Sequence, residues 1–225
     1  MKDLLKVITQ KIELLENGPV VADMQRNGLV YETNWGVSVV HLREMAKSLP
    51  KSLELAQLFW DENWRETRIL ATLAVDANEV PSPVLSAWIR DCGTIEMAEQ
   101  LAFNLLKFRT FDVAFYANLL QRSESLEQVV ALYAVGHLAA IGSDRLELFE
   151  TVKVMVSMLL PSANALNVRA LAFALRKSAR MSAKDREVVL SALNFYQNSG
   201  TKFSKIVEAD VMAELMDPSV IALLK

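Results

Sequence analysis

The stretch Thr94-Ile-Glu-Met-Ala-Glu-Gln-Leu-Ala-Phe-Asn-Leu-Leu-Lys-Phe108 decides the fold class. Its apolar residues recur at steps of three and four: Ile95, Ala98, Leu101, Leu105 and Phe108. This is the spacing of one face of an α-helix. Thr94 precedes the run as an expected N-cap, because a threonine hydroxyl accepts a hydrogen bond from a free backbone N–H of the first turn.

The same pattern recurs along the whole chain. It predicts helices at 2–16, 19–27, 38–48, 51–60, 63–76, 82–91, 94–107, 110–121, 125–141, 144–159, 163–180, 183–197 and 201–216, with a short one after Pro218. Two residue pairs have the spacing of capping boxes, Asn63 with Glu66 and Ser125 with Gln128. Further N-caps are expected at Ser38, Thr94, Ser182 and Thr201.

The predicted helices form pairs that begin at 38, 63, 94, 125, 163 and 201. The steps between these starts approach the helix-pair repeats of roughly 34–47 residues found in solenoid proteins. The chain has only 7 Gly and 6 Pro, which disfavours a turn-rich β architecture. The sequence therefore predicts an all-α fold, an α-solenoid (superhelix) of HEAT-like antiparallel helix pairs, with 1–225 as a single domain.

Composition excludes several classes of protein. Cys92 is the single cysteine and the two histidines, His41 and His137, are far apart, so neither a disulfide nor a metal site is expected. The N-terminal stretch lacks the uninterrupted apolar core of a secretion signal, and no apolar run reaches the roughly 20 residues of a membrane span. No phosphate loop or common hydrolase motif is present. We expect a cytoplasmic protein with no cofactor.

Charge is distributed unevenly. The net charge is −3, but 161–205 contains eight cations and two acids. That segment is therefore +6 and the remainder −9. An anionic partner is expected to meet the C-terminal third of the chain.

Two segments together resemble the DNA alkylation repair family of HEAT-like glycosylases, the AlkD type. The first is Trp35-Gly-Val-Ser-Val-Val-His-Leu-Arg-Glu-Met-Ala-Lys47, which is similar to the early "GV…LR…AK" signature of that family. The second is Val168-Arg-Ala-Leu-Ala-Phe-Ala-Leu-Arg176, which is similar to the late "(R/K)-A-x-x-W-A-L-R" helix. With the helical pattern between them, the resemblance covers most of the chain.

The resemblance implies a basic concave groove for duplex DNA carrying a cationic alkylated base. Two tryptophans and an aspartate of the family contact the damaged nucleotide, and an arginine steadies the backbone. In this chain Phe173 falls at the late tryptophan, Ile95 at the other tryptophan and Glu99 at the aspartate, while His137 or Leu138 takes the place of the arginine. The resemblance thus supports the fold more strongly than the catalysis.

The candidate DNA-binding residues follow steps of three and four on one predicted helix: Arg169, Phe173, Arg176, Lys177 and Arg180. Guanidinium and ammonium groups around an aromatic ring suit phosphate contact combined with stacking. The alternative is a solvated helix face with Phe173 in the core. Glu99 is the candidate catalytic carboxylate, whereas Glu96 is explained by the helix dipole after Thr94.

Other residues have structural explanations that we weigh above functional ones. Trp60, Trp64 and Trp88 are expected to fill the core, as large aromatics at helical spacing usually do. Cys92 has no nearby base in the sequence and is not expected to be a nucleophile.

The leading hypothesis is a DNA-binding repair protein, which if active is an N-glycosylase that excises positively charged alkylated purines. Its partner would be double-stranded DNA, with neither membrane nor metal involved. The alternative is a non-catalytic scaffold that binds a protein partner, or an unusual DNA structure, on its concave face.

Overall fold

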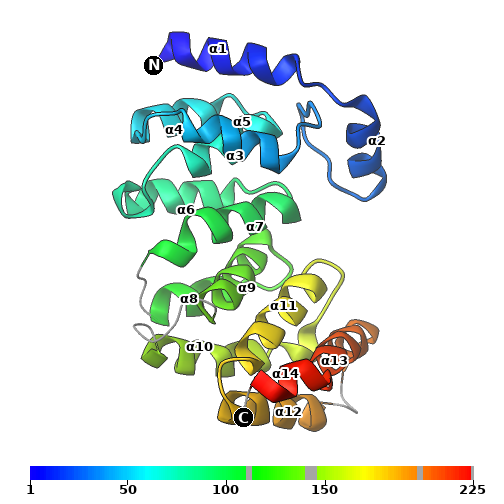
Figure 1. Ribbon diagram of the computed structural model, residues 1–225. Coiled ribbons are helices and arrows are strands. Elements are labelled where there is room, and N and C mark those ends of the chain that lie inside the picture. Colours follow the sequence, from blue (N-terminus) through cyan, green and yellow to red (C-terminus); the bar gives the residue numbers. More distant parts are fainter. Residues whose placement is uncertain (110–112, 140–145, 197–199, 224–225) are drawn as a thin grey trace. The chain divides into compact units, whose positions relative to one another are not determined.

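The computed structural model describes residues 1–109, 113–139, 146–196 and 200–223 (Figure 1). The chain folds into two compact units, Met1–Arg109 and Thr110–Lys225. Each unit has its own layers of helices and its own buried core. The single domain expected over 1–225 stays a prediction.

The helices of the first unit form two layers. They are α1 (Lys2–Glu13), α2 (Gly18–Arg26), α3 (Val39–Lys47), α4 (Leu53–Asp61), α5 (Arg65–Leu73), α6 (Ser82–Arg90) and α7 (Ile95–Asn104), with short 3₁₀ helices η1 (Ala77–Glu79) and η2 (Leu106–Phe108). Helices α3, α5 and α7 contact one another in series, while α4 packs on α5 and α1 on α4. Leu55, Phe59, Ile69 and Leu101 lie fully buried between these layers.

The helices of the second unit repeat this layering. They are α8 (Val113–Leu120), α9 (Leu126–Ala139), α10 (Leu146–Ser157), α11 (Val168–Ala179), α12 (Ala183–Tyr196), α13 (Lys202–Leu215) and α14 (Pro218–Leu223), with a 3₁₀ helix η4 (Leu160–Ser162). Helices α9, α11 and α13 contact in series to form one layer, and α8, α10 and α12 form the other. Stacked helix pairs bury the faces that a single pair leaves exposed.

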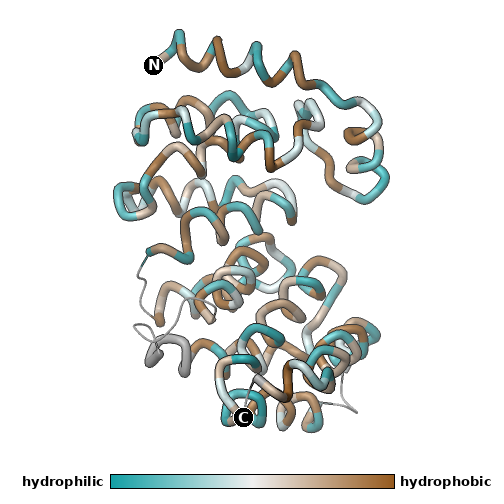
Figure 2. The backbone as a smooth tube through the Cα atoms, viewed as in Figure 1, coloured by the Kyte–Doolittle hydropathy of each residue, from teal (hydrophilic) through white to brown (hydrophobic). Residues whose placement is uncertain are grey.

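Helix α9 is the centre of the second unit. It is apolar on every side, and from Gln128 to Ala139 each residue except His137 is buried. Such a helix must be surrounded, and α9 contacts α8, α10 and α11. Figure 2 shows brown, apolar residues recurring between teal, hydrophilic ones along the helices of both units. Among the described residues, no helix is long and apolar enough to cross a membrane.

The predicted N-caps are confirmed at five positions, but the capping box of Ser125 with Gln128 is only half formed, because the Gln128 side chain bonds to Leu120 and Asn167 instead. The hydroxyls of Ser38, Thr94, Ser125, Ser182 and Thr201 each accept a hydrogen bond from a backbone N–H of the first turn that follows. These bonds satisfy donors that no intrahelical carbonyl can reach.

The capping box predicted for Asn63 and Glu66 is wrong. Asn63 has a positive φ of 62° and its amide donates to Glu32 at 2.6 Å, so α5 begins two residues later. Glu66 is fully buried and accepts instead from the backbone N–H groups of Trp35 and Val37. Glu66 therefore anchors the loop at Trp35 and Val37 and does not cap its own helix.

The predicted helix at 163–180 begins later than expected, at Val168. Asn164 and Asn167 exchange hydrogen bonds with each other's backbone, and the amide of Asn167 also donates to Gln128 at 3.0 Å. Asparagine side chains that bond locally compete with the helix.

The predicted fold class is confirmed as an all-helical, HEAT-like repeat fold. Among the described residues the only β pairing is an isolated bridge between Thr33 and Trp64.

Candidate nucleic-acid interface

Helix α11 carries four of the five predicted DNA-binding residues and Arg180 is its C-cap, and the structure divides the five into two groups. Arg169 is exposed and forms no ion pair within the described residues. Lys177 places its ammonium 5.7 Å from the centre of the Phe173 ring. Arg176 and Arg180 instead turn toward α13. The role of the five in DNA binding stays a prediction.

The two arginines toward α13 are held in an ion-pair network. Arg176 lies 3.0 Å from Asp210 and 3.3 Å from Glu214, and Arg180 lies 2.7 Å from Glu214. These groups are partly exposed, so the pairs add little to stability. They do neutralise much of the positive charge that the sequence assigns to this helix.

Phe173 is half-buried between α11 and α9. Its ring lies 4.9 Å from that of His137 and 5.6 Å from that of Tyr133. A Cβ at Gly136 would meet two of its ring atoms at 2.5 Å, so the glycine makes room for the phenylalanine. Phe173 therefore packs against α9 on one side, as the alternative of a core residue predicts. The ammonium of Lys177 also lies near its ring.

Glu99, the predicted catalytic carboxylate, lies on α7 with its side chain at the surface. Partial burial raises its pKa, the charge of Glu96 raises it further, and Arg43 of α3 opposes both. Ile95, one turn before it, is half-buried. The predicted catalytic role of Glu99 is untested by this geometry.

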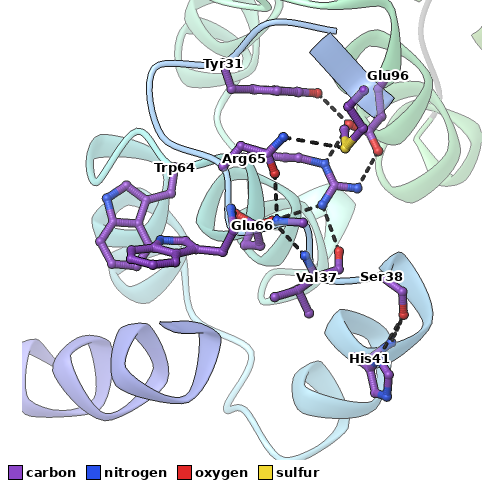
Figure 3. Close-up of polar contacts among 12 residues, drawn as sticks. Tyr31, Val37, Ser38, His41, Trp64, Arg65, Glu66 and Glu96 are labelled. Atoms are coloured by element: carbon purple, nitrogen blue, oxygen red, sulfur yellow. Dashed lines mark hydrogen bonds and ion pairs between the residues drawn. The ribbon is translucent and has the colours of Figure 1, made fainter. Parts of the chain in front are cut away.

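Glu96 has a structural role. Its place in the first turn of α7 agrees with the helix-dipole explanation, and its carboxylate also forms contacts that the sequence did not predict. Its carboxylate accepts from Arg65 at 2.6 and 2.8 Å and from the Tyr31 hydroxyl at 2.7 Å (Figure 3). Arg65 also donates to Glu66 and to the carbonyl of Val37. Because Glu96 is committed to this network, it is not a free partner for Glu99 in acid–base chemistry.

The Arg65 network fixes a long loop onto the helices. Burial works to lower the pKa of Arg65, but its hydrogen bonds and charge interactions with Glu96 and Glu66 raise it overall. Burial, the Glu96 charge and the hydrogen bond to Glu96 likewise raise the pKa of Tyr31, so its hydroxyl remains a donor. The network joins α5, α7 and the loop around Tyr31 and Val37 within the first unit.

Sequence reasoning missed a basic, aromatic pocket of about 710 Å³ in the first unit. It is lined by Arg43 in the middle of α3, by the last residues of α5 and α7, and by residues of η1 and η2. The guanidinium of Arg43 lies 5.1 Å from the centre of the Phe103 ring, and the ammonium of Lys107 lies 3.2 Å from it. The spacing of Phe103 and Lys107 by about one helical turn indicates that they lie on the same side. The excess of cations in 161–205 instead favoured a site in the C-terminal third.

The tryptophans expected in the core are largely confirmed there. Trp60 and Trp88 stack at 4.7 Å and are 4% and 1% exposed, so their faces are not available to a base. Trp64 is half-buried and packs on Trp35. Cys92 is buried, and burial raises the pKa of its thiol to about 12, which agrees with the structural role expected.

Among the residues that the structure describes, no group of three His, Cys, Asp or Glu side chains is arranged to hold a metal ion. The second unit presents cations around the Phe173 ring on α11, and the first unit presents the Glu99 carboxylate on α7 and the pocket next to Phe103. Together with the layered helix pairs, these features define a HEAT-like repeat protein with surfaces suited to an anionic partner.

Comparison with known proteins confirms the resemblance seen in the two motifs. The model of the DNA alkylation repair enzyme family matches residues 8–209, so the chain belongs to that family. A solved structure described as a member of "a new family of proteins related to the HEAT-like repeat DNA glycosylases with affinity for branched DNA structures" superposes with a TM-score of 0.74. It is 14% identical, and the match covers 92% of this chain and 94% of that one. No curated protein sequence matches.

Proposed function

We propose that this protein binds DNA through its backbone phosphates. The observation that carries the proposal is on α11, the helix with the late family motif. There Arg169 is exposed and without an ion pair in the described residues, and Lys177 lies beside the Phe173 ring. Cations of this kind bind phosphate by releasing condensed counterions.

The branched DNA bound by the structural relative suggests which DNA form to test first. Affinity should be measured for an intact duplex and for a forked or four-way junction of the same sequence, each over a range of salt. We expect affinity for both to fall as salt rises, because each neutralised phosphate makes binding salt-dependent. Binding that does not change with salt, or no binding to either DNA, would overturn the proposal.

Base excision is a second candidate, favoured by the surface position of Glu99 at the place of the family aspartate. In that reaction the glycosidic bond electrons leave with an alkylated purine that departs neutral. Water then bonds to the sugar carbon and loses a proton. The ionised carboxylate would stabilise the cationic sugar electrostatically.

Arg43 lowers the pKa of Glu99, but burial and the charge of Glu96 raise it more, so this second candidate rests on the position of Glu99. The test is release of methylated base from duplex DNA. Glu99→Gln should abolish release while leaving DNA affinity equal or higher, since a carboxylate repels phosphates. If the unmutated protein binds DNA and releases no base, the glycosylase hypothesis is wrong and the DNA-binding proposal stands.

A further inference from the structure

The pocket of the first unit has the composition of a nucleotide site. Phe108 lines the pocket and is 55% exposed, and the ammonium of Lys107 lies 3.2 Å from the centre of the Phe103 ring and 4.6 Å from that of the Phe108 ring. Arg43 reaches the same Phe103 ring from α3. We propose that this pocket binds an unpaired nucleotide of branched DNA, an inference that rests on the proposed DNA-binding function.

The cations supply the phosphate contact. Arg43 forms no ion pair within the described residues, although it lies on the surface. The pKa of Lys107 is lowered by burial and by the charge of Arg43, so the two positive groups repel each other. A phosphate between them would relieve that repulsion. Lys51 also lines the pocket, but its ammonium donates to the carbonyl of Leu73 and caps α5.

The aromatic ring supplies the base contact. Proteins that bind single-stranded DNA combine a positively charged surface with aromatic side chains on which bases stack. Phe108 is the more exposed ring of this pair, with Lys107 4.6 Å from its centre, whereas Phe103 is half-buried and lies near both Arg43 and Lys107. A paired base in an intact duplex has its faces covered by its neighbours, so only an unpaired base can stack on Phe108.

The size and the acids of the pocket distinguish a nucleotide from a free phosphate ion. A volume of about 710 Å³ is within the range of small-molecule sites, roughly 300–1,000 Å³, and far exceeds one phosphate. Asp76 and Glu79 lie on the η1 side, opposite in sign to Arg43 and Lys107. Exposed carboxylates there, next to Asn78, suit a base edge that donates a hydrogen bond, such as the N3–H of thymine, and disfavour a second phosphate.

The test uses the full chain with three fluorescent DNAs: a single thymidine strand, the same strand with abasic sites, and an intact duplex. Phe108→Ala should weaken binding of the thymidine strand by about tenfold, in the range measured for loss of one base–aromatic stack. It should leave the duplex and the abasic strand unchanged. Phe108→Trp should retain or increase strand affinity, which a loss of folding could not produce.

Arg43→Ala tests the phosphate contact and should weaken the thymidine and abasic strands alike. Matched controls are Phe195→Ala, which removes a ring that is 79% exposed in the second unit, and Lys47→Ala, one turn beyond Arg43 on α3 and outside the pocket. Neither control should change strand affinity.

The outcomes separate this inference from the proposed function. If the unmutated protein binds the duplex but Phe108→Ala binds every DNA as the unmutated protein does, the inference is overturned and DNA binding stands. If Phe108→Ala weakens abasic and thymidine strands equally, base stacking is also overturned. If no DNA binds, both proposals fall.

Discussion

The first unit keeps Arg43 against the Phe103 ring with no ion pair in the described residues, whereas the second unit holds Arg176 and Arg180 against the acids of α13. The sequence suggests the reverse, because the segment 161–205 has an excess of cations. The compensating acids, Asp210 and Glu214, lie just beyond that segment. The positive charge available to a partner therefore depends on which helix packs beside each cation, not on a count along the chain.

Arg65 is the buried extreme of this comparison. It is 4% exposed and pairs with two carboxylates, so its charge is neutralised inside the first unit. A substitution at this buried cation should change the protein more than substitutions at the partly exposed ion pairs of α13 or at the exposed Glu99.

The largest effect is expected for Arg65→Ala. Removing one member of a buried ion pair leaves Glu66 and Glu96 without a counter-charge, which costs about 3–5 kcal/mol of unfolding free energy. Urea titration measures this loss. The matched control is Arg26→Ala, because the ion pair that Arg26 forms among the described residues, with Asp23, is exposed, and its loss should cost about 1 kcal/mol or less. Equal losses for the two variants would show that the network does not hold the loop.

A smaller effect is expected for Glu214→Gln, which removes the ion pair of Arg180 and one of the two ion pairs of Arg176, while Asp210 still holds Arg176. DNA affinity should rise by about threefold, which corresponds to the weak energy of partly exposed ion pairs. Glu208→Gln on the same helix removes the same charge, and no ion pair of Glu208 is among those the structure describes. A threefold rise in both variants would mean that net charge alone, and not the loss of these ion pairs, sets the affinity.

Helix positions could be predicted from the sequence because apolar spacing and capping residues are local signals. Thr94 and Thr201 cap their helices as their positions indicate. Asn63 did not, because its partner Glu66 is bound by a loop distant in sequence. The predicted site depended still more on distant contacts. Neither the pairing of Arg176 with α13 nor the meeting of Arg43 with Phe103 leaves a local pattern.

The smallest effect concerns Glu99 and stability. Its pKa is raised in the folded protein by burial and by Glu96, so ionising it costs folding free energy once the pH exceeds the unfolded value near 4.5. Glu99→Gln should therefore raise the melting temperature slightly at neutral pH, and the gain should vanish below that value. A variant that is less stable at neutral pH would show that Arg43 outweighs the two opposing causes.

The most direct test of the account compares two arginines of α11, Arg169 without an ion pair in the described structure and Arg176 paired with α13. The measurement is DNA affinity against salt concentration for the unmutated protein, Arg169→Ala and Arg176→Ala. A phosphate contact contributes about 0.9 to the slope of log affinity against log salt. Arg169→Ala should reduce the slope by about that amount, and Arg176→Ala should leave it nearly unchanged. Equal reductions, or a slope of zero for the unmutated protein, would contradict the account.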